Sequence, residues 1–149
     1  MSDSAQTLIE QLRLLPHPEG GWYRETWRAA AAGGERAGGT AIIFLLKSDE
    51  ASHWHRVDAD ELWIWQGGDA LDLRIAASDE GPADTIRLGG DVAAGEQLQG
   101  LVPTGAWQSA RPASGGMAGY CLVSCVVVPG FDFAGFELAP AGWEPGEVL

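Results

Sequence analysis

The sequence predicts an all-β domain, a sandwich or barrel, with one helix at its N-terminus. From Gly21 onward, short apolar runs alternate with turn residues, a pattern typical of many short strands. Glycine accounts for 21 of the 149 residues, roughly twice its usual share, which favours turns and short strands over long helices. The length fits one domain over residues 1–149, with a core over residues 20–139.

The N-terminal segment is the one stretch with helical periodicity, and we expect a helix over residues 4–15. Its apolar side chains recur at helical spacing: Leu8, Ile9, Leu12 and Leu15. Asp3 or Ser4 can cap its first turn, and Pro16 and Pro18 end it. We expect this helix to pack on the outside of a sheet.

The rest of the chain is expected to form strands. They cover residues 22–29, 40–47, 52–57, 60–66, 69–77, 84–88, 95–103, 106–112, 118–129 and 133–139. The run at 40–47, TAIIFLLK, is apolar throughout, as in a strand buried on both faces. The tail over residues 140–149 is expected to pack loosely.

Charge and composition exclude several classes of partner. The chain carries 9 Lys and Arg against 21 Asp and Glu, a net charge of −12. Such a chain is poorly suited to the phosphate backbone of nucleic acids or to anionic membrane surfaces. It has neither a signal-peptide pattern at the N-terminus nor an apolar run long enough to cross a membrane.

The two cysteines, Cys121 and Cys125, lie four residues apart on an expected strand. At ~3.3 Å per residue they stand about 13 Å apart, too far for a disulfide. We therefore expect two reduced, buried thiols, which favour a cytoplasmic protein.

The residues best suited to catalysis or metal binding lie in the stretch SHWHRVDADELWIWQGGDAL, at 52–71. His53 and His55 are two apart, so on a regular strand both point to one face. Glu61 follows on the next strand. Two imidazoles and a carboxylate converging inside a barrel suit Fe(II), Mn(II), Ni(II) or Zn(II), with positions open for a substrate.

Two motifs in this region resemble those of the cupin superfamily. The residues that match the first motif are His53, His55, Glu61 and Gly67. Those that match the second motif are Pro103, Gly105 and Gln108. The stretches 16–26, 52–71 and 127–138 resemble a small branch of cupins often labelled sugar epimerases of the RmlC-like type, and the likeness covers residues 8–140.

This resemblance implies a double-stranded β-helix, the cupin jelly-roll barrel, with one N-terminal helix packed outside. In cupins the second motif supplies a third histidine to a metal, whereas here Gln108 stands at that position. One reading is a single divalent metal ion, Fe, Mn, Ni or Zn, held by His53, His55, Glu61 and Gln108. The other is a metal-free pocket in which the same side chains hydrogen-bond a small-molecule ligand. Similar proteins are commonly dimers, so we expect a homodimer, supported by an apolar sheet face such as that of residues 40–46.

The expected roles in the site follow from these motifs. His55 and Glu61 are the catalytic candidates, as base, acid or metal ligand. The expected ligand-binding residues are His53, Gln108, Trp63, Trp65, Tyr23 and Arg24. His17 and Glu19 belong either to a structural turn or to a pocket rim.

Three functions remain open from the sequence. The first is an isomerase or epimerase acting on a sugar-like or other small polar molecule. The second is a cupin that binds a metabolite without chemistry, and the third is a metal-dependent oxygenase or lyase. An anionic, nucleotide-linked sugar would require positive groups at the pocket mouth, for which the candidates are Arg24, Arg56, Arg74 and Arg111.

Overall fold

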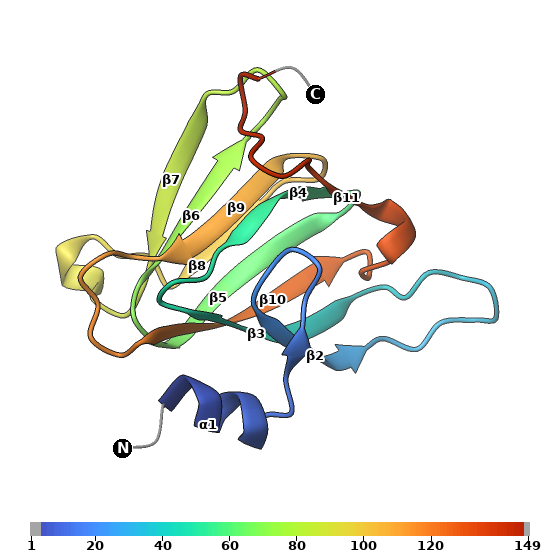
Figure 1. Ribbon diagram of the computed structural model, residues 1–149. Helices are drawn as coiled ribbons and strands as arrows, with labels where there is room; N and C mark the ends of the chain where they lie inside the picture. Colours follow the sequence, from blue (N-terminus) through green and yellow to red (C-terminus); the bar gives the residue numbers. More distant parts are fainter. Residues whose placement is uncertain (1–3, 148–149) are drawn as a thin grey trace.

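The computed structural model describes residues 4–147. Its elements are α1 (Ser4–Gln11), β1 (Leu15–Pro16), β2 (Trp22–Arg28), β3 (Thr40–Lys47), β4 (Ser52–Val57), β5 (Asp60–Gly68), β6 (Leu71–Ala76), β7 (Ala83–Leu88), η1 (Val92–Ala94), β8 (Gln99–Val102), β9 (Trp107–Pro112), β10 (Tyr120–Val128), η2 (Phe133–Gly135) and β11 (Phe136–Leu138). The strands form two antiparallel sheets that face each other (Figure 1). One has the order β1-β2-β3-β10-β5-β8 and the other β11-β4-β9-β6-β7. The prediction of an all-β fold with one N-terminal α-helix is confirmed.

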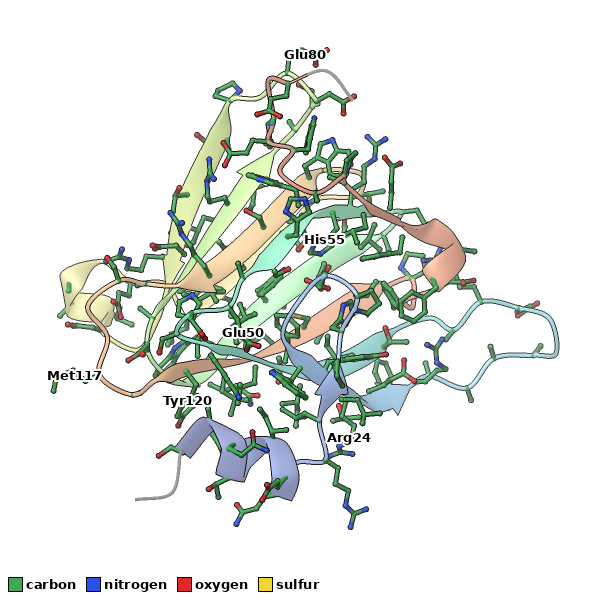
Figure 2. The ribbon with its side chains drawn as sticks, in the orientation of Figure 1. Arg24, Glu50, His55, Glu80, Met117 and Tyr120 are labelled. Carbon is green, nitrogen blue, oxygen red and sulfur yellow. The ribbon has the colours of Figure 1, made fainter. Side chains whose placement is uncertain are left out.

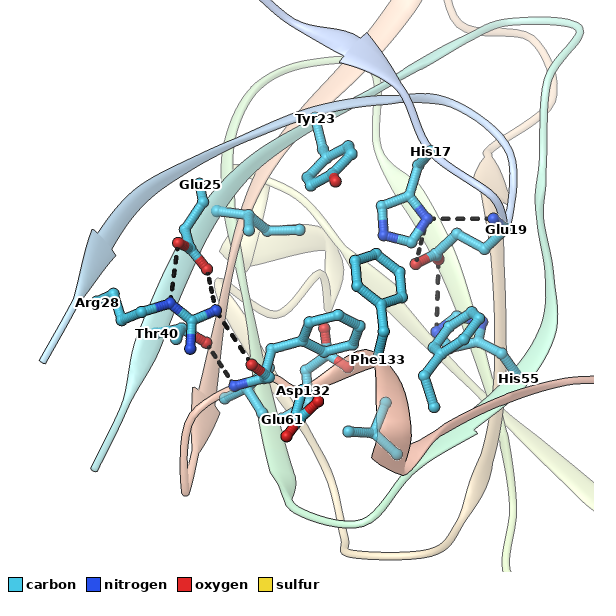
Figure 3. Close-up of a pocket in the computed structure, with 15 residues that line it drawn as sticks. His17, Glu19, Tyr23, Glu25, Arg28, Thr40, His55, Glu61, Asp132 and Phe133 are labelled. Atoms are coloured by element: carbon cyan, nitrogen blue, oxygen red, sulfur yellow. Dashed lines mark hydrogen bonds and ion pairs between the residues drawn. The ribbon is translucent and has the colours of Figure 1, made fainter. Parts of the chain in front are cut away.

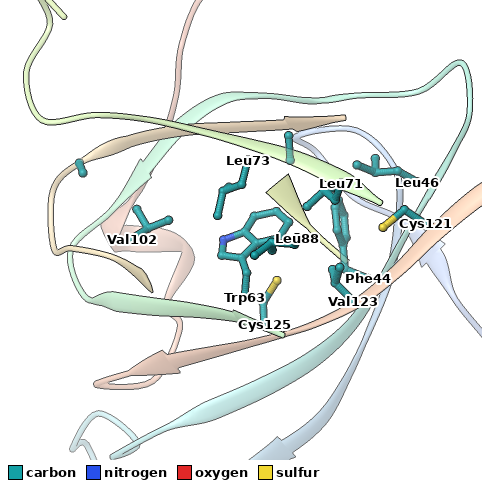
Figure 4. Packing of buried hydrophobic residues seen from close by; sticks show 12 residues of the cluster. Phe44, Leu46, Trp63, Leu71, Leu73, Leu88, Val102, Cys121, Val123 and Cys125 are labelled. Atoms are coloured by element: carbon teal, nitrogen blue, oxygen red, sulfur yellow. The ribbon is translucent and has the colours of Figure 1, made fainter. Parts of the chain in front are cut away.

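The core lies between the sheets and is filled by large apolar side chains (Figure 4). Trp63, Leu73 and Phe44 are fully buried there. Strand β3 is covered on both faces, as its apolar run predicts, because Phe44 points into this core while Leu45 packs under α1. Helix α1 therefore covers part of the sheet face, over residues 40–46, that was expected to support a dimer.

The helix is shorter than predicted and ends at Gln11, although it does pack outside the six-stranded sheet. Arg13 adopts a left-handed conformation with φ of 56°. Its N–H bonds the carbonyl of Glu10 at 3.2 Å, and the N–H of Leu14 bonds that of Ile9 at 2.9 Å. This is a Schellman cap, closed by the apolar contact between Leu14 and Ile9. The candidate cap Asp3 lies outside the described residues.

A β-bulge in β4 corrects the prediction that His53 and His55 share a face. Ser52 pairs with Ala110 of β9, and His55 pairs with Gln108, so three steps along β4 oppose two along β9. The extra residue reverses the alternation of side chains. His55 consequently points inward, whereas His53 Nε2 lies 2.9 Å from the carbonyl oxygen of Pro140.

The segment after Pro140 was predicted to pack loosely, but the buried side chain of Trp143 anchors it to the sheet. Trp143 is only 3% exposed and packs against Trp54 and Trp107 on the outer face of the five-stranded sheet. The N–H of Ala139 also bonds the carbonyl of Trp54 at 3.0 Å. Residues 148–149 lie outside the described part of the chain.

The remaining differences are small. The stretch predicted as one strand over 133–139 divides into η2 and β11, and Asp132 accepts a hydrogen bond from the N–H of Ala134 at the start of η2. Cys121 and Cys125 are buried and free, as predicted. Within residues 4–147, no helix has both the length and the apolar character that a membrane crossing requires.

Candidate functional site

A cavity of about 490 Å³ lies inside the barrel (Figure 3). Strands β2, β3, β4, β5 and β10 line it, together with the turn between β1 and β2 and the segment over residues 131–136. One part of its wall is polar and holds His17, Glu19, His55 and Glu61. Another part is aromatic and is formed by Phe131, Phe133 and Phe136.

The turn between β1 and β2 inserts His17 and Glu19 into the barrel. Gly20 has φ of 109°, and a side chain there would collide with the carbonyl oxygen of Ala51. Only glycine permits both this conformation and this close approach. The turn is tied to β4 because the N–H of His53 bonds the carbonyl of Glu19 at 2.7 Å.

Glu19 lies between two imidazoles. Its Oε1 is 3.2 Å from His17 Nδ1, and its Oε2 is 3.4 Å from His55 Nε2. The hydroxyl of Ser52 donates a hydrogen bond to the same carboxyl group. The side chains of Glu19, His17 and His55 are each at most 9% exposed, so water screens these contacts poorly.

The hydrogen bonds indicate which of these groups carries the proton. His17 Nδ1 accepts the backbone N–H of Glu19 at 3.1 Å. His55 Nδ1 lies 2.7 Å from the carbonyl oxygen of His53 and must donate to it. The single lone pair of His17 Nδ1 is thus used by the backbone N–H, and the one hydrogen of a protonated Glu19 can be donated from Oε2 to Nε2 of a neutral His55.

The direction of the pKa shifts agrees with this assignment. Burial raises the pKa of Glu19 to about 8, against the opposing effect of the Ser52 hydrogen bond. Burial and the nearby His55 lower the pKa of His17 to about 4. Burial also lowers the pKa of His55. At neutral pH, both imidazoles are neutral and Glu19 is a carboxylic acid.

Glu61 is a second buried carboxyl group in the cavity wall. Its Oε1 accepts a hydrogen bond from Gln108 Nε2 at 3.0 Å. Burial raises the pKa of Glu61 to about 7, although the neighbouring His55 opposes this shift. Near neutral pH, Glu61 can therefore both release and accept a proton.

Gln108 supports Glu61 from behind and does not line the cavity. Its Oε1 accepts a hydrogen bond from Trp63 Nε1 at 2.8 Å. This contact fixes the orientation of the amide, with its nitrogen toward Glu61 and its oxygen toward the core. The oxygen that would bind a metal is thus directed toward Trp63, away from Glu61.

The four predicted metal ligands are not brought together. His53 is on the outer side of β4 because of the bulge, and Gln108 directs its nitrogen toward Glu61 and its oxygen toward Trp63. No group of three or more His, Cys, Asp or Glu side chains within residues 4–147 is arranged to hold a metal ion. The donor set does not fit the metal that the cupin motifs imply.

The structure separates the other predicted site residues. His55, Glu61 and Tyr23 line the cavity. Arg24 is outside the barrel beside α1, and its Nε donates to the carbonyl of Leu12 at 2.7 Å (Figure 2). Trp63 and Trp65 belong to the apolar core rather than to the cavity wall.

Several lining residues were not predicted as site residues. Glu19 and His17 were weighed as a turn or a rim but prove to be interior groups. The Phe-rich stretch over 131–136 contributed to the family resemblance and in part to a predicted strand over 133–139, but none of its residues was assigned to the site. The signal available in the sequence was a polar pair between prolines and glycines, and three phenylalanines within six residues.

The comparisons with known proteins identify the family. Residues 6–139 match a family model, Cupin_5, described as cupin superfamily (DUF985), and the chain therefore belongs to the cupin superfamily. The uncharacterized protein YML079W of Saccharomyces cerevisiae is 30% identical over 148 residues, covering 87% of this chain and 72% of the yeast protein.

Solved structures agree with the cupin jelly-roll fold. A hypothetical protein from Leishmania major has a TM-score of 0.84 at 36% identity, covering 93% of this chain and 89% of that one. Protein SO0799 from Shewanella oneidensis has a TM-score of 0.82 at 40% identity, covering 93% and 85%. Oxalate decarboxylase from Bacillus subtilis has a TM-score of 0.60 at 15% identity, covering 83% of this chain and 29% of the enzyme, and shares the fold alone. That enzyme has Mn(II) centres.

Proposed function

We propose that the protein binds a small molecule in the barrel cavity and transfers a proton to or from it, as an isomerase does. The observation that carries this proposal is the convergence of two buried carboxyl groups, Glu19 and Glu61, and His55 on one cavity. Purely structural polar groups do not need to face an open volume of about 490 Å³. Groups that exchange protons with a ligand must face the volume that the ligand occupies.

Each group has a distinct role in this proposal. Glu61, with its pKa near neutrality, removes a proton from the ligand in its ionised form and returns one in its protonated form. Glu19, held as a carboxylic acid, can donate its proton to Nε2 of His55, whose Nδ1 is fixed as a donor by the carbonyl of His53. Gln108 is a positioning residue, because it holds the Glu61 carboxyl group through its amide nitrogen.

The proposal involves no metal step, because the donor groups are not assembled around one point. The metal-dependent oxygenase or lyase is accordingly the weakest of the three functions considered. A cupin that only binds a metabolite is the runner-up, because the aromatic wall over residues 131–136 suits binding without chemistry.

Deuterium exchange tests the proton-transfer role. The purified protein is incubated in D₂O with a panel of small carbonyl and amino compounds, and incorporation at carbon is followed by NMR. We expect at least one compound to exchange, and Glu61→Gln to abolish the exchange. Glu80→Gln is the matched control, because Glu80 is an exposed carboxylate remote from the cavity (Figure 2).

The possible outcomes separate the functions. A compound that binds in the cavity without exchanging supports the non-catalytic alternative. Exchange that survives in Glu61→Gln contradicts the role of Glu61. Exchange that appears only on adding a divalent metal contradicts the metal-free proposal.

A further inference from the structure

The charged groups that line the cavity are mostly acidic. Four carboxyl groups line it: Glu19, Glu25, Glu61 and Asp132. Arg28 is the one Lys or Arg in the lining among the described residues. Glu19 holds a proton near neutral pH and Glu25 is paired with Arg28, so an anionic ligand would be opposed by Asp132 and by Glu61 in its ionised form.

The charge of Arg28 is already engaged. Its NH2 and Nε donate to the two oxygens of Glu25 at 2.6 and 3.1 Å, and NH2 also donates to the carbonyl of Phe131 at 3.1 Å. The Glu25 carboxylate thus binds the same two N–H groups of the guanidinium that a ligand carboxylate or phosphate would bind in a two-pronged pairing. Arg28 therefore offers little to an anionic ligand.

The two imidazoles do not compensate for the carboxyl groups. His17 Nδ1 accepts a hydrogen bond from the backbone of Glu19, and His55 Nδ1 donates to the carbonyl of His53. His17 Nδ1 therefore carries no proton, and burial lowers the pKa of both rings below 6.5, so near neutral pH the cavity gains no positive charge from them.

The aromatic wall supplies a surface that attracts cations. The ring centroids of Phe131 and Phe133 are 4.8 Å apart, and Phe136 lies 5.9 Å from each of them. Tyr23 faces the same cavity, with its ring 4.5 Å from that of His17. Aromatic faces attract alkylammonium groups, and the attraction grows when the cation is removed from water.

The arginines that the sequence offered for an anionic ligand lie elsewhere. Arg56 pairs with Glu137 at 3.0 Å and stacks over Trp107. Arg74 stacks over Trp54, and Arg24 bonds the end of α1. None of these three, nor Arg111, lines the cavity.

We infer that the ligand of this cavity is a small organic cation, an alkyl- or arylammonium compound, rather than an anion such as a nucleotide-linked sugar. The inference rests on the proposed function only in taking this cavity as the binding site. The cationic group lies between the carboxyl groups and the aromatic wall. The apolar part of the ligand contacts Ile42, Val57 and Val127.

Three probes of matched shape and different charge test the inference. They are choline, its uncharged carbon isostere dimethylbutanol, and the anion dimethylbutanoate. Each is titrated into isotopically labelled protein near neutral pH at low salt, and the shifts of cavity-lining NMR signals give the dissociation constant. We expect choline to bind about 10-fold more tightly than dimethylbutanol, and dimethylbutanoate to bind most weakly.

Variants locate the effect. Phe136→Leu keeps an apolar side chain and should weaken choline binding while changing dimethylbutanol binding little. Asp132→Asn, at an exposed position whose change should not impair folding, should also reduce the preference for choline. Glu80→Gln should leave it unchanged.

The outcomes distinguish this inference from the proposed function. Dimethylbutanoate binding as tightly as choline overturns the inference, even if deuterium exchange on another compound supports proton transfer. Equal affinities for choline and dimethylbutanol, or no cavity shifts with any probe, also overturn it. A preference for choline that depends on Phe136 supports it, whether or not exchange is found.

Discussion

At the scale of single residues, Glu19 and Glu61 are unusual because both are buried carboxyl groups without a cationic partner. The carboxyl group of Glu19 contacts one nitrogen each of His17 and His55 and the hydroxyl group of Ser52. The carboxyl group of Glu61 accepts a hydrogen bond from the amide of Gln108. Burying an ionised carboxylate without a positive partner costs several kcal/mol, so the protonated form of each carboxyl group is favoured. The fold therefore holds protons that the unfolded chain would release.

These protons set the pH dependence of stability. The folded pKa of Glu19 is about 8 and that of Glu61 about 7, both raised from 4.5, so the folded state binds more protons above pH 4.5. Stability should rise as pH falls from about 8, by roughly 1.4 kcal/mol per pH unit for each proton. The folded pKa of His17 is lowered from 6.5 to about 4, and that of His55 is also lowered. Between pH 6.5 and 4.5 the two extra protons on the carboxyl groups are offset by the two protons missing from the imidazoles, so stability should change little there and should fall below pH 4.5. Urea unfolding should show the free energy of unfolding declining from about pH 6.5 to 8, with a plateau between about pH 4.5 and 6.5.

Glu19→Gln tests the origin of that slope. Glutamine imitates the protonated acid but does not titrate, so the decline between pH 6.5 and 8 should become shallower. Glu80→Gln, in an exposed loop, should keep the wild-type slope. A slope in Glu19→Gln equal to that of the wild type would contradict the assignment.

Gln108 provides a second prediction at this scale. Gln108→Leu leaves the Trp63 indole N–H and the Glu61 carboxyl group without their buried partner. We expect a loss of about 1–3 kcal/mol in the free energy of unfolding, measured by chemical denaturation. Gln99→Leu, at an exposed strand position, should change stability by much less. Equal effects of the two substitutions would show that the bridge contributes nothing.

At the scale of elements, irregularities in otherwise regular strands and helices position the site. The β4 bulge directs His55 inward and His53 outward. The glycine turn before β2 brings Glu19 beside His55. Regular periodicity predicts neither feature, because each depends on the partner strand or on the packing of a distant backbone.

The cap of α1 is open to improvement. Arg13 has φ of 56°, a conformation that disfavours residues with a Cβ. Arg13→Gly should stabilise the protein by roughly 0.5–1 kcal/mol. The control Gln11→Gly, at the last helical residue, where φ is not positive, should instead destabilise it, by at most about 1 kcal/mol. Differential scanning calorimetry distinguishes the two directions, and destabilisation by Arg13→Gly would contradict the cap.

The C-terminal segment should contribute strongly to stability. Trp143→Ala removes a ring buried between Trp54 and Trp107, and we expect a loss of about 3–5 kcal/mol in the free energy of unfolding. Trp27→Ala, where the ring is 51% exposed, is the matched control and should have a much smaller effect. A negligible effect of Trp143→Ala on the urea midpoint would mean that the segment is not held as the structure indicates.

At the scale of the whole molecule, the homodimer stays a prediction. The sheet face first assigned to it is partly covered, because Leu45 is buried under α1. Sedimentation equilibrium should give twice the 15.7 kDa mass of the chain. A single species at the monomer mass across the concentration range would refute the dimer.

The sequence by itself determined the all-β class and nearly every strand, because apolar alternation and glycine turns are local properties. The family followed from the resemblance of its motifs to those of cupins. The sequence also identified His55 and Glu61, which line the cavity. Only the tertiary structure decided that His53 leaves the site, that the Gln108 oxygen faces Trp63, and that Glu19 joins His55. The physical reason is that bulges, hydrogen-bond partners and buried protons arise from contacts between segments far apart in the chain. Because of such contacts, His53 and Gln108 do not join His55 and Glu61 as metal ligands. Glu19 and His17 lie beside His55 in the cavity wall instead.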